Sequence, residues 1–270
     1  MKRYARVLTI AGSDSGGGAG IQGDMKAISA TGGYAACAIT AITIQNTIGV
    51  KDVFPLPKNV IKEQIEAVMD DIGADAIKIG MLHSAEVVHT VKEALEGYGV
   101  RNVVLDPVMV STSGHRLIEE EAIDSLISDL IPLARVITPN IPEAEILAGM
   151  KIDSQADLPI AARKLSYGGK VSVLMKAGHL SGDSLVDYFY NAEQDHMIEL
   201  QSLRCDTKNT HGTGCTLSSA FASYLAQGYE LDDAAGMSKE YISNAIRSGA
   251  DYECGKGHGP VNHFYMLNNK

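Results

Sequence analysis

The chain has 270 residues, and its 33 acidic and 23 basic side chains give a formal net charge of −10. Apolar residues make up 45% of the sequence, which is enough for a full hydrophobic core and excludes a disordered or collagen-like protein. Because a nucleic-acid backbone is usually bound through a basic face, the charge argues against a nucleic-acid partner. The sequence contains no Pro/Ser-rich linker, charge block or internal repeat, so we expect one domain over residues 1–270.

No apolar run reaches the ~18 residues that suggest a membrane span, and the N-terminal apolar stretch is shorter than the roughly 7–15 residues of a signal-peptide core. The four cysteines form no C-x-x-C pair and the eight histidines include no H-E-x-x-H motif, so a structural zinc site has no support. Free thiols also suit a reducing compartment. We therefore expect a soluble, cytoplasmic protein without a membrane partner.

Short apolar runs rich in Val and Ile alternate along the chain with stripes of helical periodicity. The runs are flanked by Gly, Pro or Asn, which is typical of strands buried on both faces of a parallel sheet; they cover residues 5–12, 75–81, 101–108, 134–140 and 170–178. The stripes place apolar side chains on one helix face at Ile61, Ile65, Val68, Met69 and Ile72, and again at Val87, Val91, Ala94 and Leu95. Ser154 and Asp157 have the spacing of a capping box at the start of a further helix.

Two segments depart from this alternation. Residues 184–203 alternate with period two around a turn at residues 191–195, which predicts an antiparallel hairpin, and residues 36–54 are also rich in strand-forming residues. From Gly212 onward the pattern predicts two helices and a short tail. The fold class that we expect is α/β, with a mostly parallel central sheet flanked by helices on both faces and a small antiparallel strand excursion.

A glycine-rich segment, residues 11–20, separates the first predicted strand from the first predicted helix. Gly18, Gly20 and Gly23 match the dinucleotide fingerprint G-x-G-x-x-G, but no acidic residue follows at the distance that a ribose site requires. A nicotinamide site is therefore not expected, and no P-loop motif is present. Two interpretations stay open: a mobile turn without a ligand, and a loop that lets a small substrate approach the backbone closely.

A second glycine cluster, residues 206–216, opens a long apolar helix. The amides around Gly212 and Gly214 would lie at the helix N-terminus, where the dipole and unpaired N–H groups favour an anion such as a phosphoryl group. Cys215 lies in that first turn, where a thiol is expected to have a depressed pKa. The alternative interpretation is a Gly-Thr helix cap with an inert, small core residue.

Polar residues also follow the carboxyl ends of predicted strands, the edge at which open α/β sheets bind ligands. Asp106 and Lys176 each end a buried apolar run, and a lysine in that place suits a nucleotide phosphate. Asn140 and Glu143 have two interpretations that spacing cannot separate. They match a capping box, and they could hold Mg²⁺ through water, as phosphate-transfer sites require.

Together these segments resemble the hydroxymethylpyrimidine/phosphomethylpyrimidine kinases, a family with the ribokinase-like fold. The matching segments follow one another over nearly the whole chain, at residues 11–26, 40–47, 77–82, 103–114, 136–147, 173–179, 206–222, 239–246 and 257–264. The resemblance implies a kinase of thiamin biosynthesis that uses ATP and Mg²⁺. Such a kinase phosphorylates 4-amino-5-hydroxymethyl-2-methylpyrimidine and then converts the monophosphate to the diphosphate.

The resemblance also implies roles for individual residues. It assigns the pyrimidine to Gly12, Asp24, Gln45 and Met81, with Val108 lining the pocket. Asp24 and Gln45 can pair with the ring nitrogens and the exocyclic amine, while Met81 packs on the ring.

On the nucleotide side, the resemblance implies an anion hole at residues 212–215 for the transferred phosphoryl group. The residues that it places at the nucleotide are Asn140, Glu143, Lys176 and Thr213, with Asp106 and Glu143 holding Mg²⁺ partly through water. It makes Cys215, Gly212, Gly214 and Lys176 the catalytic set, and Cys215 stands where many ribokinase-like enzymes have an aspartate base. Gly23 replaces the family's usual alanine, and we expect this change only to loosen the helix start.

Other functions remain to be weighed against this one. Pyridoxal kinases share the fold, but Gln45 suits an aminopyrimidine, and residues 257–264 also follow the pyrimidine branch. A catalytically silent ligand sensor would have a damaged phosphate site, and a sugar kinase would have an aspartate in place of Cys215. Members of the family are commonly homodimers, so we expect a homodimer here too.

Overall fold

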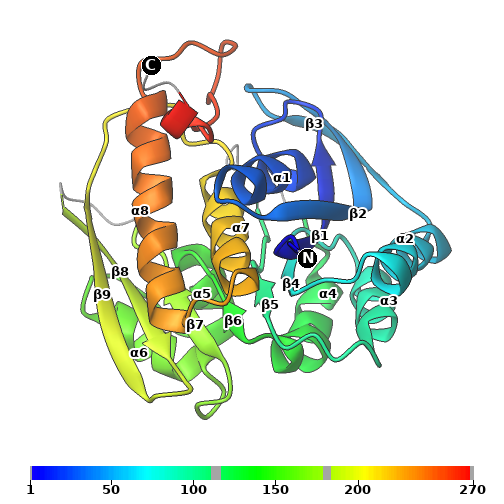
Figure 1. Cartoon of the computed structure of the whole chain (residues 1–270). Coiled ribbons are helices and arrows are strands. Elements are labelled where there is room, and N and C mark those ends of the chain that lie inside the picture. The colour runs from blue at the N-terminus through cyan, green and yellow to red at the C-terminus, as the bar shows by residue number, and fades with distance from the viewer. Residues whose placement is uncertain (1, 111–116, 179–183, 268–270) are drawn as a thin grey trace.

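The computed structural model describes residues 2–110, 117–178 and 184–267. Its strands form one mixed sheet in the order β3-β2-β1-β4-β5-β6-β7-β8-β9 (Figure 1). The parallel strands are β1 (Arg6–Asp14), β2 (Tyr34–Gln45), β4 (Ala76–Ile79), β5 (Val103–Leu105), β6 (Val136–Ile137) and β7 (Ser172–Met175). Antiparallel strands extend both edges: β3 (Val50–Pro55) at one, and β8 (Ser184–Asn191) with β9 (His196–Leu203) at the other.

Helices cover both faces of this sheet (Figure 1). One face carries α2 (Lys58–Asp71), α3 (Ala85–Leu95), α4 (Glu120–Ser125), α5 (Ile141–Ala148) and α6 (Asp157–Leu165). The other face carries α1 (Gly20–Ala30), α7 (Thr213–Ala226) and α8 (Leu231–Gly249). A π turn (Leu126–Leu130) and a 3-10 turn (Ile131–Leu133) continue α4, and another 3-10 turn (Tyr265–Leu267) ends the described chain. The strands at the centre are therefore buried on both sides.

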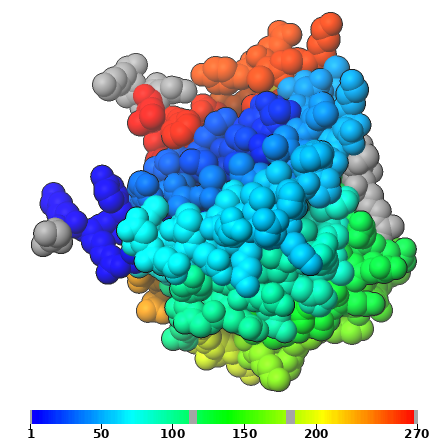
Figure 2. All heavy atoms as spheres, turned by 90° about the vertical axis from the view of Figure 1, so that its right-hand side faces the viewer, coloured from blue at the N-terminus to red at the C-terminus, as the bar shows by residue number. Residues whose placement is uncertain are grey.

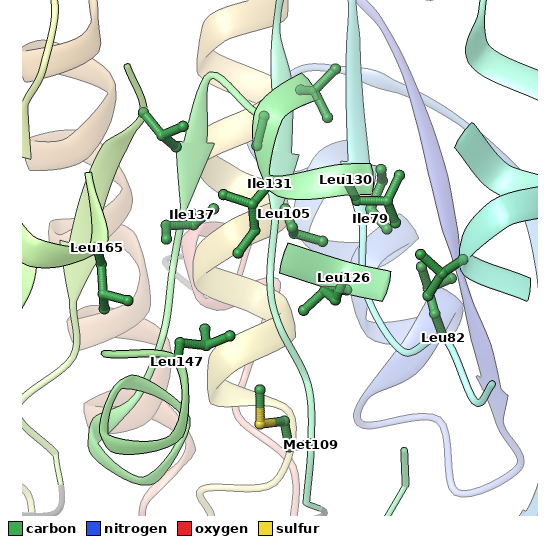
Figure 3. Packing of buried hydrophobic residues seen from close by; sticks show 14 of the residues in the cluster. Ile79, Leu82, Leu105, Met109, Leu126, Leu130, Ile131, Ile137, Leu147 and Leu165 are labelled. Atoms are coloured by element: carbon green, nitrogen blue, oxygen red, sulfur yellow. The ribbon is translucent and has the colours of Figure 1, made fainter. Parts of the chain in front are cut away.

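The core on the α2–α6 face fixes the central strands. Figure 3 shows Ile79, Leu105 and Ile137, from β4, β5 and β6, packed with Leu126 and Leu130 of the helical layer. Burying each such side chain contributes roughly 1.5–3 kcal/mol relative to leaving it in water. This packing gives the residues that follow each strand fixed positions at one edge of the sheet.

The fold class predicted from the sequence is confirmed: the sheet is mostly parallel, helices lie on both faces, and antiparallel strands are added at its edges. The two helical stripes lie on α2 and α3, and their members Ile61, Ile65, Val87 and Val91 are buried. The predicted hairpin is formed by β8 and β9, and residues 36–54 form most of β2 and β3. The two helices predicted after Gly212 are α7 and α8.

The predicted N-cap of α6, Ser154, is wrong by two residues. The helix begins at Asp157, and the residue before it, Ala156, makes no side-chain cap. The Asp157 carboxylate instead accepts hydrogen bonds from the backbone amide of Ser154 at 2.8 Å and from its hydroxyl at 2.9 Å. Because the Ser154 hydroxyl donates to that carboxylate, Ser154 closes a turn ahead of the helix rather than capping it.

The surface around α2 and α3 is continuous. Figure 2 shows this face in light blue and cyan, with the N-terminal residues in dark blue projecting to one side. Lys2, Arg3 and Tyr4 are exposed there. None of the helices in the described residues is both long and apolar enough to cross a membrane.

Candidate active site

A cavity of about 950 Å³ lies at the carboxyl ends of the parallel strands. Its walls come from the segments after β1, β5, β6 and β7, from β9 and α8, and from the start of α7. That edge is where open α/β sheets bind ligands, and the volume is at the upper end for a small-molecule site. The cavity is therefore large enough for a nucleotide beside a small acceptor.

All but one of the residues implicated by the sequence line this cavity. They are Gly12, Gln45, Met81, Asp106, Val108, Asn140, Glu143, Lys176, Gly212, Thr213, Gly214 and Cys215. Two parts of the matching segments, residues 111–114 and residue 179, lie outside the described residues.

Asp24 is the exception, and the expectation that it contacts the pyrimidine directly is wrong. Its side chain is fully buried and does not line the cavity. The carboxylate accepts hydrogen bonds from Thr9 Oγ1 at 2.6 Å, from Ser219 Oγ at 2.7 Å and from Lys78 Nζ at 2.9 Å. Because β4 buries the ammonium of Lys78, that ammonium needs a counter-ion, and α1 turns Asp24 inward to supply it.

Gly12, Met81 and Gln45 form the part of the cavity that the sequence assigns to the acceptor. A Cβ on Gly12 would lie 3.1 Å from the sulfur of Met81, so glycine allows β1 to approach that thioether closely. The side-chain amide of Gln45 accepts a hydrogen bond from Thr43 Oγ1 at 3.1 Å and lies 3.4 Å from His211 Nε2. An amide and a thioether beside bare backbone suit a flat ring with polar edges.

The glycine-rich segment after β1 is held by Asp14, a residue that the sequence interpretation missed. Its carboxylate accepts hydrogen bonds from the amides of Gly16 at 2.7 Å, Gly18 at 3.0 Å and Ala19 at 2.8 Å, and lies 2.8 Å from His211 Nε2. Burial raises the pKa of Asp14, but the hydrogen bonds from His211 and the backbone outweigh it and leave this pKa lowered. The signal in the sequence was an Asp two residues before a glycine, which is typical of an Asx turn.

Asp14 therefore holds the loop through three backbone amides, and Ala19 and Gly20 line the cavity. Gly23 also does more than loosen the start of α1, which corrects the expectation stated above. A Cβ on Gly23 would lie 2.7 Å from the carbonyl oxygen of Gly18, closer than side chains normally approach backbone. An alanine at this position would require the glycine-rich loop to shift.

The second glycine cluster forms the N-terminus of α7. Gly212 caps the helix with φ +81°, and no side chain caps it. A Cβ on Gly212 would overlap the carbonyl oxygen of Gly18, so the two glycine loops are in direct contact. A Cβ on Gly214 would lie 3.3 Å from Lys176 Nζ and 3.6 Å from Asp106 Oδ2. The helix N-terminus thus opens toward the charged groups that follow β5 and β7.

The thiol of Cys215 has a pKa raised to about 11, so the depressed pKa expected from its place in the first turn is wrong. Burial is the largest cause, and the carboxylates of Asp24 and Asp106 also raise the pKa. Lys78 and a hydrogen bond from the Gly20 amide lower it, but they do not compensate for the loss of water. A helix N-terminus activates a cysteine only where the thiolate is not desolvated as well.

Lys176, Asp106 and Glu143 form a buried charged cluster beside this turn. Lys176 Nζ lies 3.0 Å from Asp106 Oδ1 and 3.9 Å from Glu143 Oε2, and Thr138 Oγ1 donates to Asp106 at 3.0 Å. Burial raises the pKa of Asp106, but Lys176 and Lys78 outweigh it and leave this pKa lowered. Burial raises the pKa of Glu143 to about 7, with Lys176 opposing the shift and Asp106 adding to it. The cluster therefore holds more negative charge than its lysine neutralises.

Asn140 and Glu143 form the capping box of α5, so the structural interpretation of this pair is confirmed. Asn140 Oδ1 accepts a hydrogen bond from the Glu143 amide at 2.9 Å, and Glu143 Oε2 accepts one from the Asn140 amide at 2.8 Å. Both residues also line the cavity. Capping and ligand binding are therefore compatible, because the cap fixes the carboxylate at the cavity wall.

The charged cluster fits a magnesium ion of the kind that accompanies nucleotides. Mg²⁺ is usually bound by one or two carboxylates together with water and substrate phosphates. Asp106 and Glu143 offer two buried carboxylates at the cavity wall. No three His, Cys, Asp or Glu side chains gather as a metal-binding group in the described residues.

Comparison with known proteins gives these residues a context. The chain is 47% identical over 95% of its length to a thiamine biosynthesis bifunctional protein of Geobacter sulfurreducens, of which it spans about half (52%). It is 44% identical to a hydroxymethylpyrimidine/phosphomethylpyrimidine kinase of Rhizobium meliloti, over 97% of both chains.

Solved structures of related kinases have the same fold as this chain. A phosphomethylpyrimidine kinase of Clostridium difficile is 47% identical, with a TM-score of 0.75 over 89% of this chain and 99% of that one. A Bacillus subtilis pyridoxal kinase in complex with ADP has a TM-score of 0.90 at 36% identity, over 99% of this chain and all of that one (100%). The family described as phosphomethylpyrimidine kinase matches residues 14–262, so the chain belongs to this family of ribokinase-like kinases.

Proposed function

We propose that the chain transfers the γ-phosphoryl group of ATP to the hydroxymethyl group of 4-amino-5-hydroxymethyl-2-methylpyrimidine and then phosphorylates the monophosphate. These two steps supply the pyrimidine diphosphate of thiamin biosynthesis. The observation that carries the proposal is that one cavity holds Gln45 and Met81, the Gly212–Cys215 turn, and the Lys176 cluster. The cavity thus combines an acceptor site for an aminopyrimidine with a site for anionic phosphate.

The acceptor is recognised by polar contacts on one aromatic ring. The Gln45 amide can donate to a ring nitrogen and accept from an exocyclic amine, while Met81 packs on the ring face. Gly12 allows the ring to approach the backbone of β1, and Val108 closes the pocket with an apolar side chain. This set of contacts favours an aminopyrimidine over pyridoxal, which lacks the amine.

The phosphoryl group is held by backbone amides and by Lys176. The backbone amides of residues 212–215, at the N-terminus of α7, bind the phosphoryl group. Lys176 supplies a full positive charge beside these amides. When bound, Mg²⁺ neutralises charge that develops on the transferred group, with Asp106 and Glu143 as its protein partners, partly through water. Asn140 and Thr213 line the same region and position the nucleotide.

Cys215 is placed to take the proton of the acceptor alcohol. With a pKa of about 11, on the order of one thiol in 10⁴ is ionised at neutral pH in the ligand-free chain. The thiolate must therefore be stabilised by the positive charges around it when it acts. The second acceptor is already an anionic phosphate and needs no base, so positioning and charge neutralisation dominate that step.

Two alternative functions are a pyridoxal kinase and a ligand-binding sensor without catalytic activity. Two of the structurally similar proteins are pyridoxal kinases, from Bacillus subtilis and Staphylococcus aureus, so this activity is the main competitor. Gln45 favours the pyrimidine. The complete set of Asp106, Glu143, Lys176 and the Gly212–Cys215 turn disfavours a sensor that has lost phosphoryl transfer.

The chain is also proposed to act in the cytoplasm as a homodimer. The β2–β3 hairpin exposes apolar side chains that a second copy would cover, among them Ile42, Ile44 and Phe54. The mass in solution, measured by light scattering, tests the dimer.

The deciding experiment is an ATP-consumption assay with three acceptors: the hydroxymethylpyrimidine, its monophosphate and pyridoxal. We expect turnover of both pyrimidines, with pyridoxal used poorly. Turnover of pyridoxal alone would overturn the assignment, and no turnover of any acceptor would favour the sensor.

A further inference from the structure

The buried ion pair of Lys78 and Asp24 lies behind the active site and has no part in the function proposed so far. Lys78 stands in β4 between apolar neighbours, and its Nζ lies 2.9 Å from each carboxylate oxygen of Asp24. Both side chains are 0% exposed. Neither residue lines the cavity.

Burying both charges of such a pair lowers the stability of the folded protein. Removing two charges from water costs several kcal/mol per ion, and apolar residues of similar volume are often equally or more stabilising. The strand around Lys78 is otherwise apolar, so a hydrophobic residue would suit the core of the sheet. The pair is therefore better explained by what it does for neighbouring groups than by stability.

Asp24 connects the pair to the helix that carries Cys215. Its Oδ1 accepts a hydrogen bond from Ser219 Oγ at 2.7 Å, one turn beyond Cys215 in α7. The preceding residue, Ser218, donates to Asp106 Oδ2 at 3.4 Å. Two buried carboxylates on different elements thus hold the first turns of α7 in place.

Lys78 connects the pair to the thiol itself. The charged groups that act on Cys215 are Lys78 from β4, Lys176 from the end of β7, Asp24 from α1 and Asp106 from the end of β5. The ammonium of Lys78 lowers the pKa of the thiol and the carboxylate of Asp24 raises it, with Lys78 the larger of the two effects. A Cβ on Gly80 would lie 2.7 Å from Lys78 Nζ, so glycine at this position leaves the space that the ammonium occupies.

We propose that the Lys78–Asp24 pair is a positioning element of the active site: Asp24 holds α7 through Ser219, one turn beyond Cys215, and Lys78 keeps a fixed positive charge against the same part of the helix. The inference rests on the proposed function for the step in which the thiolate acts. In that step the acceptor O–H gives its proton to the sulfur, the oxygen forms a bond to the γ-phosphorus, and the bond from that phosphorus to ADP breaks. Lys78 stabilises the thiolate before the proton arrives.

The test measures how fast the Cys215 thiolate is alkylated when no substrate is present. Cys215 is alkylated with iodoacetamide at pH 8, and its modification is followed by mass spectrometry of the peptide that contains it. Lys78→Met should slow this alkylation roughly tenfold or more, because the thiolate loses a buried positive charge that favours it. Asp24→Asn should not slow it, because that change removes a negative charge. Cys254, which is exposed, is the internal reference and should react at the same rate in every variant.

Two further variants separate electrostatics from folding. A double variant, Lys78→Met with Asp24→Leu, removes both charges together and should fold at least as stably as the parent, yet alkylate Cys215 more slowly. Arg6→Gln breaks a partly buried ion pair with Asp75 at the start of β1, the end of the strand away from the cavity. This variant should lower stability without changing the rate at which Cys215 is alkylated. The double variant decides the question if Lys78→Met does not fold.

The results also separate this inference from the proposed function. If the parent phosphorylates the pyrimidine but Lys78→Met and the double variant alkylate Cys215 at the parent rate, the inference is overturned and the function stands. Equal slowing by Lys78→Met and Asp24→Asn also overturns it, since only a structural role predicts that result. If the parent has no kinase activity, the proposed function fails whatever the alkylation rates are.

Discussion

His211 Nε2 lies 2.8 Å from Oδ2 of Asp14, and this contact joins the two glycine-rich loops of the active site. Asp14 binds the amides of the first loop, and His211 directly precedes Gly212 in the second. The His211 amide in turn donates to the carbonyl of Gly259 at 3.0 Å, so the C-terminal tail supports the same junction. The spacing between the acceptor loop and the phosphoryl loop is set by this chain of contacts.

Asp14→Asn should therefore separate the loops. Asparagine keeps one acceptor oxygen but loses the charge that faces His211, which leaves buried donors unpaired at about 1–3 kcal/mol each. Because a misplacement of about 1 Å can cost on the order of 10²-fold in rate, we expect kcat to fall more than thermal stability suggests. Steady-state kinetics with both acceptors and a melting curve measure this. Asp52→Asn, at an exposed position in β3, is the control; a stable Asp14→Asn enzyme of full activity would contradict the junction.

Gly212→Ala tests the contact between the loops directly. The substitution places a Cβ at φ +81° and into the carbonyl of Gly18. Gly97 is a matched control, because it has φ +92° and nothing within 4 Å of an added Cβ. Gly97→Ala should cost roughly 1–2 kcal/mol from backbone strain and keep its activity. Gly212→Ala should cost more and lose most activity; equal losses of stability in the two variants, measured by urea unfolding, would mean that the loops do not touch.

The arrangement of the fold followed from local sequence patterns. Apolar runs of Val and Ile predicted the parallel strands, because such runs are favourable only where both faces are covered. The hairpin of β8 and β9 followed from its period of two. Residues at strand ends, such as Asp106 and Lys176, were found because parallel strands bring their carboxyl ends to one edge.

What could not be predicted depends on pairings between distant segments. Asp24 pairs with Lys78 in another element, and nothing in the local pattern shows which face of α1 its side chain occupies. The pKa of Cys215 depends on how much water reaches the thiol, which only the packed structure determines. Asp14 and His211 are 197 residues apart, so their contact has no local signature.

Glu143→Gln tests whether this residue does more than cap α5. Glutamine can accept the same hydrogen bond from the Asn140 amide, so the capping box survives. We expect Mg²⁺-ATP use to weaken by roughly 10–100-fold while pyrimidine binding changes little. Kinetics against Mg²⁺-ATP and calorimetry with the pyrimidine measure the two effects. A variant with unchanged turnover would leave Glu143 only its capping role.

The free energy of unfolding of Glu143→Gln should also depend on pH differently from that of the parent. Because the folded pKa of Glu143 is raised from 4.5 to about 7, its contribution to the free energy of unfolding is full below pH 4.5 and is lost as pH rises through 7. Glutamine has no such dependence, so Glu143→Gln should gain stability relative to the parent between about pH 5 and 8. Urea unfolding at each pH measures the difference, and a constant difference would contradict the raised pKa.

Gln45→Met tests substrate choice. The substitution removes an amide that can donate and accept, which leaves the polar edge of the pyrimidine unpaired at roughly 1–3 kcal/mol. We expect kcat/KM for the pyrimidine to fall and that for pyridoxal to fall less or to rise. Parallel assays of both acceptors measure the ratio; equal losses would show that Gln45 shapes the pocket without selecting the ring.

Cys215→Ala separates the two phosphoryl transfers. In the first, the acceptor is a neutral alcohol, and a positioned group that takes its proton contributes roughly 10²–10⁴-fold. In the second, the acceptor is an anionic phosphate and needs no base. The backbone amides of residues 212–215 survive the change, because they do not depend on the side chain. Cys215→Ala should therefore depress the alcohol step far more than the phosphate step.

The pH dependence of the alcohol step adds a second measurement to this variant. With a thiol pKa of about 11, the thiolate fraction rises with pH throughout the neutral range, so kcat for the alcohol should rise with pH in the parent. Cys215→Ala should lack that rise, while the phosphate step should show the same pH profile in both proteins. Steady-state kcat is measured for each acceptor separately at saturating Mg²⁺-ATP. If the variant slows both steps by the same factor, or keeps the rise with pH, the thiol is not the base and Cys215 only packs at the start of α7.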